Sequence, residues 1–140
     1  MESKAVFLDT NIVADMIDSR RPNHALSLRL LEQLTLEFYE VFISEDMVST
    51  LYYISDDKEA TLAFLEHVVY VDWHVVPYGK DLLMEATRIA SIEKTDLEDT
   101  LQCLCARDHG CAALITCDRT FVDCGVPAVD YTTFTQGTPS

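Results

Sequence analysis

Asp96 and Asp99 open a segment, TDLEDTLQCLC at 95–105, that is acidic at its start and mostly apolar afterwards. Residues three apart lie on one face of a helix, so we expect these two carboxylates to project from the same side, with Glu98 turned well round the helix. Carboxylates in a first helical turn also complement its free N–H groups and the positive end of the helix dipole. The pair is therefore open to two interpretations, a helix cap or part of a metal site.

Two further aspartates follow predicted strands. Asp9 comes directly after the apolar run AVFL at 5–8, and Asp118 comes two residues after the run AALIT at 112–116. In open parallel sheets, ligands bind outside the carboxyl ends of the strands, so both aspartates are candidates for a site. Both also have an ordinary structural interpretation, since aspartate commonly forms turns and caps helices.

The aspartates of these segments form a candidate metal site. Carboxylates packed together repel one another and raise each other's pKa, so such a cluster is stable mainly when a cation occupies it. Oxygen ligands without thiolate or imidazole suit Mg²⁺ or Mn²⁺. Two such ions about 4 Å apart activate water and stabilise the leaving oxygen in phosphodiester hydrolysis. The candidate metal ligands are Asp9, Asp96, Asp99 and Asp118.

The elements that must position these residues alternate between strands and helices. Strands are predicted at 5–8, 40–44, 73–78, 112–116 and 126–131, and helices at 12–18, 24–38, 45–54, 58–69, 81–92 and 96–110. Such alternation predicts an α/β fold, a three-layer α/β/α sandwich with a central, mainly parallel sheet. We expect one domain over 1–136 and a short polar tail at 137–140.

Bulk composition narrows the class of protein. No apolar run approaches the roughly 18 residues needed to span a bilayer, and the N-terminus lacks the pattern of a signal peptide, so we expect a cytoplasmic protein without a membrane partner. The five cysteines include no CxxC pair, and an odd count suggests small buried side chains in a reducing compartment, not a disulfide framework or a zinc site. The chain has a net charge of −14, so as a whole it repels phosphate. The charge indicates either a soluble protein with a basic partner or a site in which acidic residues are concentrated to bind cations.

Three motifs occur in order along the chain. FLDTNIV at 7–13 places Asp, Thr and Asn after a strand, DLEDTLQCLCARDHGCAALIT at 96–116 joins an Asp-x-x-Asp helix to a strand and a Thr, and TCDRTF at 116–121 forms a Thr-x-Asp-x-x-Phe turn. In this order and spacing the motifs resemble the PIN-domain family, the fold of VapC-type toxin ribonucleases. The closing segment GVPAVDYTTF resembles the family's last strand and short helix, so the resemblance spans nearly the whole chain.

The resemblance implies roles for particular residues. Metal coordination is implied for Asp9, Asp99 and Asp118, with Asp96 nearby on the same helix face, and supporting roles in the catalytic site for Asn11 and Thr116. It further implies a Mg²⁺- or Mn²⁺-dependent endoribonuclease that acts on a structured RNA such as transfer RNA. The expected partners are a cognate antitoxin and a second copy of the chain in a homodimer.

One position departs from the family pattern. Many members carry a glutamate six residues after the serine that ends the second strand, and Thr50 stands there in this chain. Asp46, one turn earlier on nearly the same face, and Glu45 are the candidate substitutes. Two interpretations are open for the basic residues Arg20, Arg21, Lys94 and Arg119, which could ring the site and hold phosphates or could belong to ordinary solvated surface.

Two alternatives stay open from the sequence. Thr50 leaves room for a PIN scaffold with a depleted site, which would bind RNA or protein without cutting it. Another Mg²⁺-dependent phosphohydrolase also places an aspartate after its first strand, but a dehalogenase-like site would need Asp-x-Asp where this chain has Asp9, Thr10 and Asn11.

Overall fold

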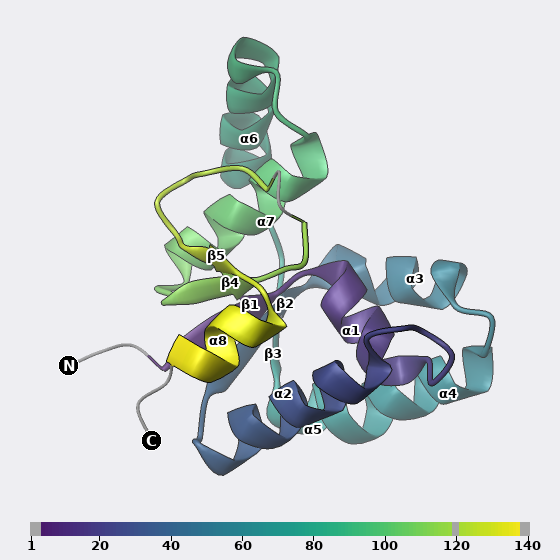
Figure 1. Ribbon diagram of the computed structural model, residues 1–140. Helices are drawn as coiled ribbons and strands as arrows, with labels where there is room; N and C mark the ends of the chain where they lie inside the picture. Colours follow the sequence, from purple (N-terminus) through teal and green to yellow (C-terminus); the bar gives the residue numbers. More distant parts are fainter. Residues whose placement is uncertain (1–3, 119–120, 138–140) are drawn as a thin grey trace.

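Five short strands form a parallel sheet in the computed structural model, which describes residues 4–118 and 121–137 (Figure 1). The strands are β1 (Ala5–Leu8), β2 (Glu40–Ser44), β3 (His74–Val76), β4 (Ala113–Ile115) and β5 (Ala128–Val129). Their order across the sheet is β3-β2-β1-β4-β5, and every neighbouring pair is parallel. The predicted parallel sheet is therefore confirmed.

The central strand β1 determines where a site can form. All four of its residues are buried, as expected for a strand covered on both faces, and this explains the uninterrupted apolar run AVFL. The chain continues from β1 to β2 on one side, whereas β4 pairs with β1 on the other. The direction of the connections therefore changes between β1 and β4, and the crevice at their carboxyl ends is the usual ligand site of such a sheet.

Helices cover both faces of the sheet. They are α1 (Thr10–Ile17), α2 (His24–Leu36), α3 (Glu45–Ile54), α4 (Lys58–Phe64), α5 (Tyr70–Asp72), α6 (Lys80–Glu93), α7 (Leu97–Asp108) and α8 (Tyr131–Gly137), with a π-helical turn, η1, at Leu65–Val69. In Figure 1, α6 and α7 lie above the strands and α2 and α8 below them, which confirms the three-layer arrangement. None of the helices in the described part of the chain is both long and apolar enough to cross a membrane.

Several predicted boundaries differ from the structure. The helix predicted at 58–69 is interrupted, because its last five residues form the π-helical turn η1. The strand predicted at 73–78 ends at Val76, since Pro77 has no N–H to donate to the sheet. Helix α2 ends at Leu36, two residues early, and Phe38 follows with a left-handed φ of 59°. Of the predicted tail, residues 138–140 lie outside the described residues.

The cysteines depart from expectation in two ways, by a disulfide and by the exposed thiol of Cys117. Cys103 of α7 forms a disulfide with Cys124, with 6.1 Å between their Cα atoms. The two cysteines are 21 positions apart in the sequence, and the odd cysteine count does not reveal their contact. Cys105 and Cys111 are buried thiols, as predicted, and burial raises the pKa of each to about 12.

Helix α7 begins with a side-chain cap. The Oδ1 atom of Asp96 accepts a hydrogen bond from the backbone N–H of Asp99 at 2.9 Å, and the Asp96 carbonyl accepts one from the backbone N–H of Thr100 at 3.0 Å. From Thr100 to Ala106 every residue of the helix is buried. The cap therefore fixes the point at which α7 starts, and with it the position of Asp99 in the first turn.

We expect Asp96→Ala to be about 1 kcal/mol less stable than Asp96→Asn, because asparagine caps a helix and alanine does not. Both substitutions remove the same negative charge, so their difference isolates the cap. Urea denaturation in the presence of EDTA measures the two free energies of unfolding. Equal stability of the two variants would contradict a capping role.

Candidate active site

Thr116 connects the ends of the two central strands. Its hydroxyl donates a hydrogen bond to Asp9 Oδ2 at 2.8 Å and accepts one from the backbone N–H of Asp118 at 3.0 Å. Asp9 is buried, with 7% of its surface exposed, and its backbone N–H donates to the Ile115 carbonyl at 3.0 Å. The strand-end residues predicted from the sequence are thus held together by one hydroxyl group.

Asp99 faces the same place from the first turn of α7. Its pKa is raised to about 7, first by partial burial and then by the negative charges of Asp96, Asp118 and Asp9. A hydrogen bond with Asp118 contributes in the same direction. Burial likewise raises the pKa of Asp9, although the Thr116 hydroxyl partly opposes the shift. Asp9, Asp99 and Asp118 therefore share one electrostatic environment, as the sequence predicted.

An open cleft of about 570 Å³ lies at this edge of the sheet. Its walls are formed by Asp9, Asn11, Asp15, Arg21, Pro22, Asn23, Cys117 and Asp118. Among the described residues, no three Asp, Glu, His or Cys side chains converge closely enough, as they stand, to hold a metal ion. The donors that do face one another are carboxylate oxygens, which suit Mg²⁺ or Mn²⁺, and a divalent cation would turn their repulsion into attraction.

Glu98 was misplaced by sequence reasoning. Its Oε1 accepts a hydrogen bond at 3.4 Å from Gln102 Nε2, which also donates at 3.4 Å to the hydroxyl of Thr10, next to Asp9. Partial burial, followed by the charges of Asp46, Asp96 and Asp9, raises the pKa of Glu98. The side chain of Glu98 therefore belongs to the acidic cluster. The signal in the sequence was Gln102, a polar residue in the apolar part of the helix, four positions after Glu98 and so on the same helix face.

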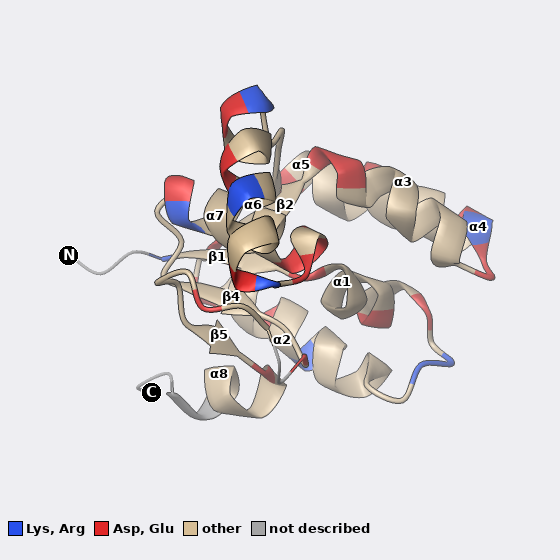
Figure 2. Ribbon diagram, turned by 90° about the horizontal axis from the view of Figure 1, so that it is seen from above, with Lys and Arg blue, Asp and Glu red and all other residues tan. Residues whose placement is uncertain are grey.

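Asp46 lies in the first turn of α3, and its negative charge acts on Glu98. Figure 2 shows acidic residues (red) at the start of α3. Ser44, at the end of β2, donates a hydrogen bond from its hydroxyl to Asp46 Oδ1 at 2.6 Å. Thr50 is exposed and donates to the Asp46 carbonyl at 3.3 Å. Of the two candidate substitutes for the missing glutamate, Asp46 is the one whose charge acts on Glu98, and no such effect of Glu45 is found.

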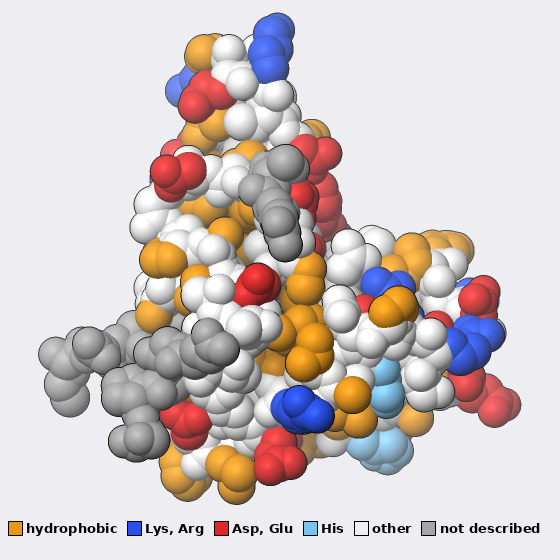
Figure 3. All heavy atoms as spheres, in the orientation of Figure 1, with side chains coloured by type: hydrophobic (Ala, Val, Ile, Leu, Met, Phe, Trp, Pro, Cys, Tyr) orange, Lys and Arg blue, Asp and Glu red, His pale blue; other side chains and the backbone are white. Residues whose placement is uncertain are grey.

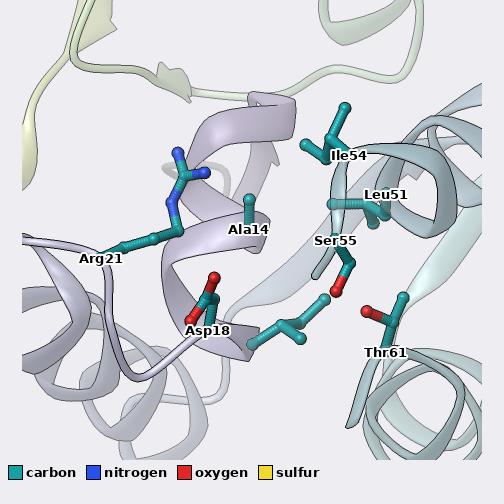
Figure 4. Close-up of a pocket in the computed structure, with 8 residues that line it drawn as sticks. Ala14, Asp18, Arg21, Leu51, Ile54, Ser55 and Thr61 are labelled. Atoms are coloured by element: carbon teal, nitrogen blue, oxygen red, sulfur yellow. The ribbon is translucent and has the colours of Figure 1, made fainter. Parts of the chain in front are cut away.

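The loop between α1 and α2 brings one arginine to the cleft. Arg21 donates from Nη2 to Asn11 Oδ1 at 3.2 Å, so the exposed Asn11 side chain contacts this arginine. Figure 4 shows the guanidinium of Arg21 beside α1 and directed away from Asp18. Arg20 instead pairs with Asp18 at 3.1 Å and Asp56 at 3.2 Å. Lys94 is exposed at the end of α6, and Arg119 lies outside the described residues.

Comparison with known proteins gives a consistent result. The family model of the PIN domain matches residues 6–126. Ribonuclease VapC1 of Aquifex aeolicus (strain VF5) is 33% identical over 125 residues, which cover 86% of each chain.

Two solved structures have a similar fold. VapC20 of Mycobacterium tuberculosis, described as a toxin that cleaves the sarcin-ricin loop, superposes with a TM-score of 0.69 at 16% identity, over 86% of this chain and 95% of that one. VapBC2 of Rickettsia felis, bound to a DNA fragment from its promoter, gives a TM-score of 0.68 at 17% identity, over 90% and 98% of the two chains. At these identities the two structures support the fold.

We expect Asp99→Asn to stabilise the metal-free protein at about pH 8, and the gain to disappear as the pH falls towards 4. The pKa of Asp99 is raised from an ordinary 3.8 to about 7, so the folded state retains a proton that the unfolded state releases. Ionised Asp99 therefore costs stability as the pH rises through this window, and costs nothing below it.

Urea denaturation with EDTA at several pH values measures this gain. Asp72→Asn is the matched control, because Asp72 precedes β3 and so lies at the amino ends of the strands, opposite the cleft. If the stability gained by Asp99→Asn is the same at acidic and alkaline pH, the charge of Asp99 does not destabilise the folded protein.

Proposed function

The chain belongs to the PIN-domain family, and from this premise we propose that it is a divalent-metal-dependent endoribonuclease, the toxin of a toxin–antitoxin pair. The observation that carries the proposal is the convergence of Asp9, Asp99 and Asp118 from three separate segments onto one electrostatic environment at the carboxyl edge of the sheet. The relative named ribonuclease VapC1 supports the same activity.

The roles of the side chains follow from their positions. Asp9, Asp99 and Asp118 hold the cation, and Thr116 keeps the Asp9 carboxylate oriented through its 2.8 Å hydrogen bond. Asp96 fixes the start of α7 and adds negative charge beside Asp99. Bound Mg²⁺ or Mn²⁺ supplies Lewis-acid stabilisation of the phosphate and activates a water molecule.

The substrate class we propose is a structured RNA, such as transfer RNA. One structural neighbour is described as cleaving the sarcin-ricin loop, which supports a folded RNA target. Lys and Arg side chains are few and separate from one another on the face shown in Figure 3, so an extended basic surface does not account for binding there. Contact would then be concentrated at the cleft, where bound cations offset the acids.

The partners we propose are an antitoxin and a second copy of the chain. An acidic cleft favours a partner segment that carries arginine, because a guanidinium placed among carboxylates forms charge-assisted hydrogen bonds there. The structural neighbour described as VapBC2 bound to a DNA fragment from its promoter supports an antitoxin as partner.

A second candidate function rests on Thr50. This residue is exposed, and its hydroxyl bonds to the backbone of its own helix, so it supplies no carboxylate to the cleft. A protein depleted in this way would bind RNA or a protein partner without cutting it. The Asp46–Glu98 side of the cluster weighs against depletion, because it adds two carboxylates near the missing position.

We expect Asp99→Asn to reduce cleavage of a small-RNA pool by about 100-fold or more, since losing even the partners of metal ligands costs about 10- to 100-fold. Gel analysis with Mg²⁺ or Mn²⁺ measures the rate, EDTA should abolish it, and Asp72→Asn should cut at the normal rate. Retained RNA binding without cleavage by the unmodified protein would favour the scaffold.

Metal binding can be tested without RNA. At about 100 times its Kd, Mn²⁺ should stabilise the protein by about 2.7 kcal/mol, equivalent to a Tm increase of roughly 5–10 °C. The increase should be larger at alkaline than at acidic pH, because the cation must displace the proton on Asp99. The double variant Asp9→Asn/Asp99→Asn should lose the increase and Asp72→Asn should keep it; an equal increase in all three proteins would place the ion elsewhere.

A further inference from the structure

We propose that Arg21 binds a backbone phosphate of the RNA in the cleft, beside the carboxylates. The proposal rests on the proposed function, because its ligand is the RNA substrate. It assigns to Arg21 a binding role and to Asp15 and Tyr131 the role of positioning it.

Arg21 is held at the cleft by two hydrogen bonds. Its Nε donates to Asp15 Oδ1 at 2.7 Å, and its Nη2 donates to Asn11 Oδ1 at 3.2 Å. A guanidinium carries five N–H donors, so three are left for a ligand. Arg21 also forms the wall of the same cleft as Asp9 and Asp118, so a ligand held by these donors would lie next to the proposed metal ligands.

Asp15 is an unusual anchor because it is buried. Its second oxygen, Oδ2, accepts a hydrogen bond at 2.7 Å from the hydroxyl of Tyr131, a buried residue at the start of α8. The backbone carbonyl of Asp15 lies 2.7 Å from His24 Nδ1 at the start of α2. Three helices therefore fix the carboxylate that orients Arg21.

A purely structural ion pair explains this arrangement less well. Burying a charged pair is costly, and apolar residues of similar size often stabilise a protein as much or more. The Arg21 side chain is also 33% exposed, against 7% for Asp15, so the charged head stays accessible while its anchor is hidden. This is the arrangement expected for a preorganised ligand-binding residue.

The ligand class follows from the chemistry of the guanidinium. Its planar fork matches two oxygens of a phosphate, and its charge does not titrate in the physiological range. Asp9, Asp15 and Asp118 line the same cleft, so among the described residues that line it Arg21 is the cation at which a phosphodiester is attracted. The neighbouring Arg20 differs, since its side chain is 63% exposed and pairs with Asp18 and Asp56.

This difference makes Arg20 a matched control. Arg20→Ala and Arg21→Ala change the net charge equally, at adjacent positions of one loop. Binding of fluorescein-labelled transfer RNA is measured by anisotropy over a range of salt concentrations, in Mg²⁺, with Asp99→Asn present in every protein to prevent cleavage. We expect Arg21→Ala to weaken binding about 10-fold and to reduce the salt slope by about 1, and Arg20→Ala to change neither.

Two further variants guard against misfolding and test the positioning roles. Arg21→Ala leaves Asp15 buried without its cation, so Asp15→Asn/Arg21→Gln replaces the ion pair by neutral amides and should show the same loss of RNA binding. Tyr131→Phe keeps Arg21 but frees Asp15 Oδ2, and should weaken binding by about 3-fold with an unchanged salt slope, because the phosphate contact persists. Thermal melting confirms that each variant is folded.

The outcomes separate the two proposals. If the parent protein without Asp99→Asn cuts RNA while both Arg21 variants bind like Arg20→Ala, the proposed function stands and the Arg21 site is overturned. Equal losses in Arg20→Ala and Arg21→Ala would also overturn it, since net charge alone would then explain them. If the parent protein neither binds nor cuts RNA, the proposed function fails and the inference fails with it.

Discussion

The hydrogen bond from Thr116 to Asp9 is the interaction on which the rest of the site depends. It joins the carboxyl ends of β1 and β4, the two strands between which the chain connections change direction. Through its second hydrogen bond, to the backbone of Asp118, the same hydroxyl sets where the chain leaves β4. A valine at this position would keep the volume and the strand preference but would remove the hydroxyl that donates to the buried Asp9 carboxylate.

Bringing carboxylates together has a cost that the fold must offset. The pKa values of Asp9, Glu98 and Asp99 are raised by burial and by their negative neighbours, so ionising each carboxyl group costs more free energy here than in water. Perturbed carboxyl groups of this kind concentrate at functional sites, where the arrangement serves binding or chemistry at the expense of stability. The cap at Asp96 and the buried run of α7 hold Asp99 in place against that repulsion.

Local patterns in the sequence predicted the parts of the molecule that local physics determines. AVFL and EVFIS became strands with their predicted bounds. Asp9 and Asp118 lie near strand ends because each follows an apolar run, Asp9 directly and Asp118 two residues after AALIT. Contacts between residues far apart in the sequence could not be predicted from such local patterns. Tyr131 and Asp15 are 116 positions apart, and the Cys103–Cys124 disulfide joins a helix to a distant loop, so no periodicity links them. Glu98 was misplaced because a helical wheel gives the direction of a side chain from its own helix and not the charges of β-strand ends and α3 beside it.

The extent of the family match divides the site into two parts. The matched region ends at residue 126 and contains all the carboxylates of the cleft, so the family pattern accounts for the proposed metal ligands. Tyr131 lies beyond that region, on α8, yet its hydroxyl fixes the carboxylate that orients Arg21. A chain with net charge −14 needs a local source of attraction for phosphate, and a cation held by buried contacts supplies it without an extended basic surface. In the proposed function, the position of α8 would therefore decide how RNA is held, and the strand ends would decide where it is cut.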